Sequence, residues 1–229
     1  MKKKLLLSLV IGLTMFNNGL LAQQENNDYQ TTMKGLMIKM DTASDVQMNL
    51  KVANDFNRVG EVAQTQWHPF YYAALCNVLA AFDIADIEKV DPLCDKAIIS
   101  LEKAEKISPK NSEIYCVKAM ISLARIKVNM FQRGMEGLSD AQVSLESAQE
   151  LNPDNPRVYF LLGQQSYNTP EAFGGSRKNA LALFEKAKLL FEKEGDKKNT
   201  FEASWGLGTT LKKIESCKKY LQNKVASNK

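Results

Sequence analysis

Apolar residues recur at steps of three and four along most of this chain, so that they fall on one face of a predicted α-helix. Valine and isoleucine do not alternate with polar residues over any long stretch, and the chain holds only 12 glycines and 6 prolines. The pattern therefore predicts an all-α protein in which every apolar stripe packs against a neighbouring helix. Three of these stripes are Ala97, Leu101, Ala104 and Ile107; Ala141, Leu145, Ala148 and Leu151; and Ala180, Leu183, Phe184, Ala187 and Leu190.

The stripes belong to an internal repeat. Tyr71, Tyr115 and Tyr159 are each 44 residues apart, and the same spacing separates several pairs of small or apolar residues. A repeat of this length indicates similar helix pairs that bury their apolar faces against one another in a stack. The repeated pairs are Ala97 and Ala141, Leu101 and Leu145, Ala104 and Ala148, and Pro109 and Pro153.

Capping residues and prolines predict where several helices begin. Asp91 and Asn155 each precede a proline, and a capping side chain before a proline in the first helical turn is typical of a helix start. Pro109 and Pro153 each follow a predicted helix, and Asn111 and Asn155 then begin the next one. These positions predict short, tight connections between successive units.

The two ends of the repeat region carry further helical patterns. Residues 23–66 contain two apolar stripes and are expected to form a leading pair of helices that covers the exposed face of the stack. After Gly195 ends the preceding helix, a last helix is expected to begin at Asn199 or Thr200 and to continue to Leu221. The lysine-rich residues 222–229 are expected to form a flexible tail.

The first 22 residues are predicted to be a secretory signal peptide. Three lysines at positions 2–4 precede an apolar stretch that is too short to span a bilayer, and Ala22 is a small residue at the predicted cleavage point. A retained membrane anchor is the alternative, although Asn17, Asn18 and Gly19 interrupt the apolar run. We therefore expect an exported protein, periplasmic or secreted, whose mature chain does not insert into a membrane.

Removal of the predicted signal peptide lowers the formal net charge from +4 to +1, because residues 1–22 contain three lysines and no acidic residue. Charged residues of both signs are interspersed along the rest of the chain. Since nucleic acids and anionic lipids bind to concentrated positive charge, neither is an expected partner of the mature protein.

The four cysteines and the single histidine do not form a metal-binding or catalytic pattern. The cysteine spacings match neither a zinc site nor a redox pair, so the cysteines are predicted to be small core residues, with a disulfide between Cys76 and Cys94 left open. His68 lies between Trp67 and Pro69 at a predicted helix start, and no metal ligand or nucleophile accompanies it. We expect no metal, no cofactor and no enzymatic activity.

The third unit carries a distinctive set of residues, namely Tyr159, Leu162, Gly163 and Ser166 on its first predicted helix and Ala180, Phe184 and Ala187 on its second. This set resembles the tetratricopeptide repeat, in which a large residue and a Leu-Gly pair face an Ala-x-x-x-Phe-x-x-Ala pattern. The resemblance covers about residues 67–221. It implies a right-handed solenoid of helical hairpins, with three repeats over residues 67–198 and a capping helix over residues 199–221.

The repeat is longer than the family's usual length of about 34 residues, because the turns within the units are expected to be enlarged, at residues 128–137 and 168–176. The second insert is expected to form one short helical turn that ends in a left-handed glycine, before Ser176 caps the next helix. Each insert is either a structured connector packed on the stack or a rim that contacts a ligand or partner. The rim residues would be Met130, Phe131, Glu171 and Phe173.

In the tetratricopeptide family the first helices of the repeats line a concave groove that binds peptides. The resemblance therefore implies a non-enzymatic scaffold that binds a protein or peptide partner in the cell envelope, with homo-oligomerisation left open. The alternative is a periplasmic ligand-binding component of a TRAP-type small-molecule uptake system, since similar proline and Gly-Gly inserts occur in tetratricopeptide proteins of that type. By position, the groove would present Tyr72, Cys76, Glu113, Cys116, Met120, Arg157, Phe160, Gln164 and Tyr167.

Overall fold

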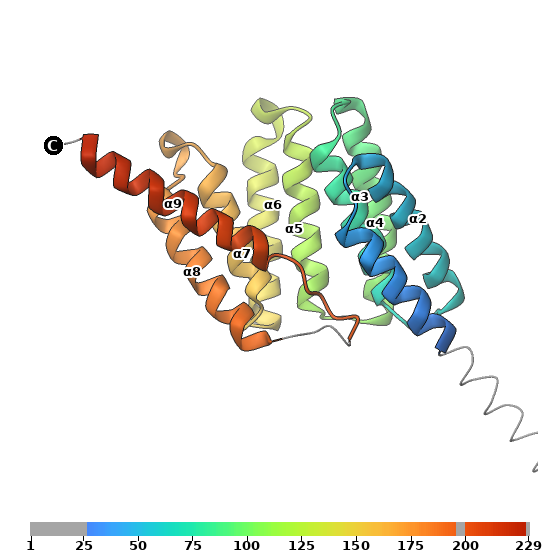
Figure 1. Ribbon diagram of the computed structural model, residues 1–229. Coiled ribbons are helices and arrows are strands. Elements are labelled where there is room, and N and C mark those ends of the chain that lie inside the picture. Colours follow the sequence, from blue (N-terminus) through green and yellow to red (C-terminus); the bar gives the residue numbers. More distant parts are fainter. Residues whose placement is uncertain (1–26, 196–199, 228–229) are drawn as a thin grey trace, which may run out of the picture.

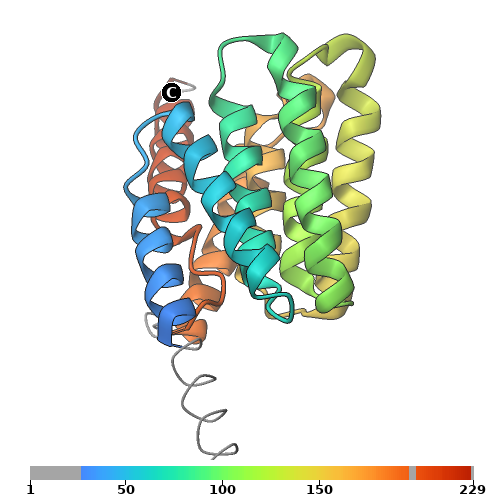
Figure 2. The same ribbon diagram turned by 90° about the vertical axis from the view of Figure 1, so that its right-hand side faces the viewer.

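The computed structural model describes residues 27–195 and 200–227, and within these ranges the protein consists of helices and turns with no strand (Figure 1). Long helices lie antiparallel, side by side, in a curved array, and Figure 2 shows their connecting turns at the two ends of the helices. The all-α prediction is confirmed. The predicted signal peptide, residues 1–22, lies outside the described residues.

Most contacts between helices join neighbours in the chain, as in the pairs α2 and α3, α5 and α6, and α7 and α8. This is compatible with the predicted helical repeat, whereas its handedness and its membership of the tetratricopeptide family stay predictions. The elements are a helix over residues 27–41, α2 (Val46–Val62), α3 (His68–Asp83), η1 (Ile87–Lys89), α4 (Val90–Ile107), α5 (Ser112–Ile126), α6 (Met130–Leu151), α7 (Pro156–Asn168), η2 (Glu171–Phe173), α8 (Arg177–Glu194) and α9 (Leu207–Ser227).

Small residues let the helices of a pair approach closely. Gly163 on α7 lies so near α8 that a Cβ atom at this position would be 2.7 Å from the ring of Phe184. That ring is fully buried, so it fills the space that the glycine leaves. The glycine and phenylalanine of the sequence pattern are therefore packing positions.

Two of the predicted helix starts are confirmed and one is wrong. Asn111 and Asn155 each accept a hydrogen bond from a backbone N–H in the first turn of α5 and α7, respectively. Asp91 does not cap α4, because that helix already begins at the residue before it. Its carboxylate instead accepts hydrogen bonds from Arg125 and Arg133, which are charged donors on the two following helices.

The two inserts differ in structure. In the second unit the extra residues lengthen α6, which begins at Met130, and do not form the enlarged turn that was expected. Gly137 disfavours a helix by propensity, but it allows α6 to pass close to a side chain of α5. In the third unit the expected short helical turn is present as η2, which ends at Gly174 with a φ of 90° before Ser176 caps α8.

The segment that precedes α9 crosses the concave side of the array. Gly195 ends α8 as expected, with a φ of 73°. The last helix, however, begins at Leu207 and not at Thr200, and it continues to Ser227, past its predicted end; Asn199 lies outside the described residues. Residues 200–206, which we call the strap, are non-helical and run across the front of the array in Figure 1.

All four cysteines are buried and free, so Cys76 and Cys94 form no disulfide. Burial raises the pKa of Cys76 to about 12 and that of Cys94 to about 11. Both thiols are therefore protonated at neutral pH, as is typical of unreactive core cysteines.

Replacing Gly163 by alanine should destabilise the protein by about 1–3 kcal/mol, because the added methyl group would have to displace the buried ring of Phe184. Gly35 is the matched control, since it lies within the helix over residues 27–41 and nothing is within 4 Å of its Cβ position. Gly35→Ala should stabilise by roughly 0.5–1 kcal/mol through helix propensity. Urea unfolding measures both, and equal effects of the two substitutions would contradict this description of the packing.

Candidate functional site

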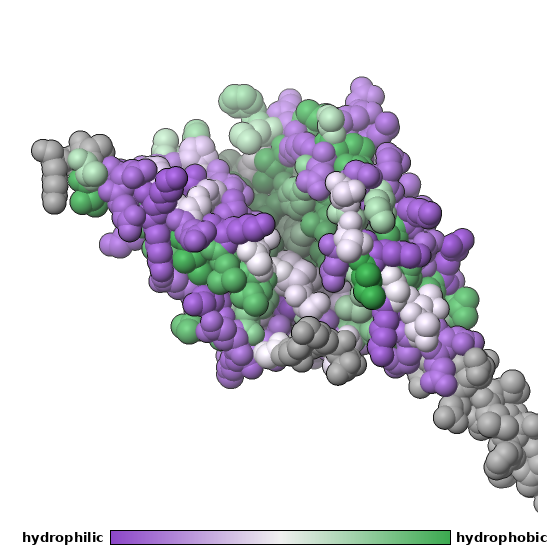
Figure 3. Space-filling model, in the orientation of Figure 1, coloured by the Kyte–Doolittle hydropathy of each residue, from purple (hydrophilic) through white to green (hydrophobic). Residues whose placement is uncertain are grey.

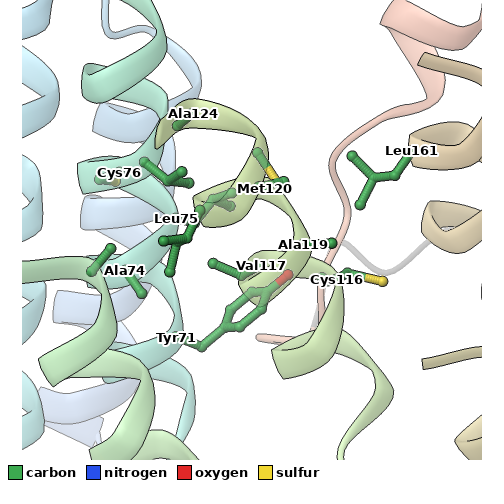
Figure 4. Close-up of a cluster of buried hydrophobic side chains, with 14 of the residues drawn as sticks. Tyr71, Ala74, Leu75, Cys76, Cys116, Val117, Ala119, Met120, Ala124 and Leu161 are labelled. Carbon is green, nitrogen blue, oxygen red and sulfur yellow. The ribbon is translucent and has the colours of Figure 1, made fainter. Parts of the chain in front are cut away.

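The concave side of the array is hollowed between α9 and the N-terminal helices (Figure 3). Apolar side chains gather in the depth of this hollow, and polar side chains cover much of α9 at its edge. Beneath it, Cys116 and Met120 of α5 lie across from Leu161 of α7, and all three are buried (Figure 4). A concave surface of this kind suits a ligand that is largely apolar.

Half-buried leucines continue this apolar surface along two helices. Leu79 lies two helical turns beyond Tyr72 on α3, and Leu123 lies two turns beyond Cys116 on α5, so each shares a helix face with a predicted groove residue. Both leucines pack against the hydrophobic core and remain partly exposed. They can therefore contact a ligand, which the fully buried Cys116 cannot do without rearrangement.

Arg157 holds the base of the concave side together. Its side chain is fully buried, and its Nη1 lies 3.1 Å from Glu113 Oε1 and 3.0 Å from Glu194 Oε1. Its Nη2 lies 3.1 Å from Glu194 Oε2 and also donates to the backbone carbonyl of Ala203 in the strap. Although burial favours the neutral form, the two carboxylates raise the pKa of Arg157 above its ordinary value, so the group stays charged.

Two adjacent tyrosines of α3 also fasten the strap. The hydroxyl of Tyr72 donates to the backbone carbonyls of residues 201 and 202, at 3.1 and 3.0 Å. The hydroxyl of Tyr71 accepts a hydrogen bond from Trp205 Nε1 at 2.8 Å and donates one to Glu113 Oε2 at 3.3 Å. Burial raises the pKa of both phenols above their ordinary value, so both keep the protons that they donate.

His68, the single histidine of the chain, is engaged at the base of the hollow. Its ring stacks on Trp67, with centroids 4.2 Å apart, and its Nε2 lies 3.1 Å from Glu202 Oε1. Its side chain is only 14% exposed. Within residues 27–195 and 200–227, no group of three or more His, Cys, Asp or Glu side chains is arranged to hold a metal ion. The histidine therefore acts here as a packing and hydrogen-bonding residue.

The predicted groove residues all lie on α3, α5 and α7, and most of them are buried. The hydrogen-bond network around the strap includes Tyr72, Glu113 and Arg157. The core contains Cys76, Cys116, Met120 and Phe160, and the half-buried residues are Gln164 and Tyr167. Their use as a groove for a partner stays a prediction.

The predicted rim residues lie at the start of α6 and in η2. Met130, Phe131 and Phe173 are 71%, 102% and 78% exposed, so they do not fold back onto the core. Glu171 accepts hydrogen bonds from Lys224 Nζ and from Tyr220, and it thereby joins η2 to α9. Whether these residues contact a ligand or partner stays a prediction.

Two features escaped the sequence analysis. One is the strap, whose only sequence signal is a pair of aromatic residues, Phe201 and Trp205, in a short segment without helical spacing. The other is a cleft of about 540 Å³ between α4, α5 and α6. The basic side chains of the cleft are Lys118, Arg125 and Arg133, and each of them is already paired with a carboxylate.

The chain is similar to a protein of known structure. Its fold matches that of the HusA haemophore from Porphyromonas gingivalis with a TM-score of 0.76, and the two sequences are 30% identical. The match covers 84% of this chain and 94% of the haemophore. Neither a protein-family model nor a curated protein matches the chain.

Arg157→Gln should destabilise the protein by about 3–5 kcal/mol, because it removes a fully buried cation that Glu113 and Glu194 share. The strap should then detach, and the fluorescence of Trp205 should shift to longer wavelength as its indole meets water. Urea unfolding gives the stability, and emission spectra in a Trp67→Phe background report on Trp205 alone.

Lys103→Gln is the control for this substitution. Its ion pair with Glu61 lies at the surface, where the two side chains are 42% and 58% exposed, so its loss should change the stability by less than about 1 kcal/mol. An unshifted Trp205 spectrum in Arg157→Gln would show that the arginine does not hold the strap.

Proposed function

Since this chain belongs to the family of the HusA haemophore, we propose that it binds haem outside the cytoplasm and carries it in the hollow on its concave side. The main support for this proposal is the similarity in sequence and fold to that haemophore, which extends over 94% of the haemophore chain. The apolar hollow described above supports it, because it offers a surface on which such a ligand can lie.

The chemistry of the ligand matches the surface of the hollow. Haem is a flat macrocycle with two wide apolar faces and two carboxylate groups at one edge. Burying an apolar face against side chains such as Leu79 and Leu123 removes both surfaces from water, which is the main favourable term in the binding of such a ligand.

Contacts to the macrocycle, rather than a protein ligand to the iron, would supply most of the affinity. Histidine, methionine, cysteine and tyrosine are the side chains that hold haem iron in proteins. Nε2 of His68 is engaged with Glu202 and its Nδ1 is buried, and Met120 is 6% exposed. Burial raises the pKa of Cys116 well above its ordinary value, so its thiol is protonated and is a poor ligand.

An exported location is part of the proposal. It rests on the predicted signal peptide and on the haemophore relative. In the part of the chain that the structure describes, none of the helices has the length and apolarity that crossing a bilayer requires. A carrier of a small ligand also agrees with the alternative function that the sequence suggested, while a link to TRAP-type uptake stays a prediction.

The mature protein should bind haemin saturably, with a Kd of about 1 μM or tighter. Trp67 and Trp205 lie at the base of the hollow, so quenching of their fluorescence measures the binding. Leu123→Glu should weaken it at least about tenfold, because it places a charge on the apolar floor. His68→Gln should change it less than about twofold.

The control is Ile99→Glu, which adds the same charge at a position on α4 that is 56% exposed, and which should leave haemin binding unchanged. Circular dichroism checks that each variant is folded. If haemin produces no saturable quenching, or if His68→Gln abolishes binding while Leu123→Glu does not, the proposed site or the proposed function is wrong.

A second candidate function is the binding of a protein partner through the exposed rim. The exposure of Met130, of its neighbour Phe131 and of Phe173 favours it, since large apolar side chains exposed at a surface can mark interaction sites. In a pull-down from envelope extract, Phe131→Ser and Phe173→Ser should lose a partner that the wild type retains. Val62→Ser, at a position that is 88% exposed on α2, should retain it; equal recovery by all variants would reject the rim.

A further inference from the structure

Two cations enclose a tyrosine ring where α9 packs against α7 and α8. The Cζ of Arg177, the first residue of α8, lies 3.4 Å from the ring centroid of Tyr167, and the Nζ of Lys213 lies 3.8 Å from it. Two groups at these distances cannot share one face of the ring, so they lie on opposite faces. The hydroxyl of Tyr167 is 2.9 Å from Ser216 Oγ, which places this cluster against α9, the helix that borders the hollow (Figures 1 and 3).

The protein balances the charges of this cluster only in part. Among the residues that the structure describes, neither Arg177 nor Lys213 forms an ion pair with a carboxylate. Glu171 is the acidic residue of this region, and its carboxylate accepts hydrogen bonds from Lys224 and Tyr220. The hydrogen bond and charge of Lys224 lower the pKa of Glu171 most, and the charge of Arg177 contributes less. Two positive charges beside α9, the helix that borders the hollow, are therefore without an ion pair of their own and can meet an anionic group.

Arg177 shows a second sign of an unfilled site. Its Nη1 atom is buried and has no hydrogen-bond partner in the described part of the protein, which costs free energy unless a ligand supplies an acceptor. The first turn of α8 also contains Lys178 and no acidic residue, and the helix dipole adds to the positive potential there. The hydrogen bond with Ser216 lowers the pKa of Tyr167, whereas burial raises it. The charges of Lys213 and Arg177 lower this pKa further, in agreement with a positive potential at the site.

We propose that Arg177 and Lys213 bind the carboxylate groups of the ligand while its macrocycle lies on the apolar floor of the hollow. This inference rests on the proposed function and names the residues that would orient the ligand. A guanidinium can bind a carboxylate through two parallel hydrogen bonds, and an ammonium group supplies a second, more mobile positive charge. Tyr167 keeps the two cations apart, so each can meet a separate carboxylate.

The test compares haemin with its dimethyl ester, which has the same iron and macrocycle but no carboxylate charge. The wild type should bind haemin at least about tenfold more tightly than the ester, since a charge-assisted hydrogen bond is worth at least that factor. The double variant Arg177→Gln with Lys213→Gln should lose this preference by binding haemin more weakly and the ester unchanged. Lys219→Gln, at an exposed position of α9, is the control and should keep the wild-type preference.

The outcomes separate this inference from the proposed function. If the wild type binds the ester as tightly as haemin, the function stands and the carboxylate site is wrong. Equal weakening of both ligands in the double variant would also overturn the site, because it would indicate a change in the fold. If neither ligand binds, both the site and the function are wrong. The single variant Lys213→Gln should show an intermediate preference, and circular dichroism checks its fold.

Discussion

The concave side of this protein depends on one buried cation. Arg157 of α7 binds Glu113 of α5, Glu194 at the end of α8, and the backbone carbonyl of Ala203 in the strap, so four elements meet at a single guanidinium. A buried cation is tolerated only where its charge and its N–H groups are matched. Two carboxylates and a carbonyl match the charge and both Nη groups of Arg157, and that carbonyl belongs to the strap that precedes α9.

The strap also changes the kind of repeat structure that the helices form. In an open solenoid each unit contacts only its neighbours, and stability adds up along the stack. Here Tyr29, near the start of the described chain, packs edge-on against Phe201 with ring centroids 5.5 Å apart, and Tyr72 binds the strap carbonyls. The two ends of the array are therefore joined across its concave side, and the base of the hollow is bounded by side chains from both.

The range of each interaction explains how much could be predicted from the sequence. Asn155 caps α7 by binding the amide two residues along, and Gly163 and Phe184 pack within one helix pair, so local pattern sufficed. The strap could not be predicted, because residues 200–206 lack a helical period and are held by residues far away in sequence, such as Tyr72. Position in a repeat predicts the face of a helix on which a residue lies, but not whether another segment covers that face.

A carrier of an amphipathic ligand must meet two opposed requirements. Apolar contacts alone would hold a flat macrocycle without fixing its orientation, whereas unpaired charges inside the protein would destabilise the empty state. Arg157 sits in the interior with its charge paired to two carboxylates, whereas Arg177 and Lys213 flank Tyr167, and all three of these side chains remain partly exposed. Because Nε2 of His68 is engaged with Glu202 and its Nδ1 is buried, orientation by charge beside α9 is the arrangement that these residues support best.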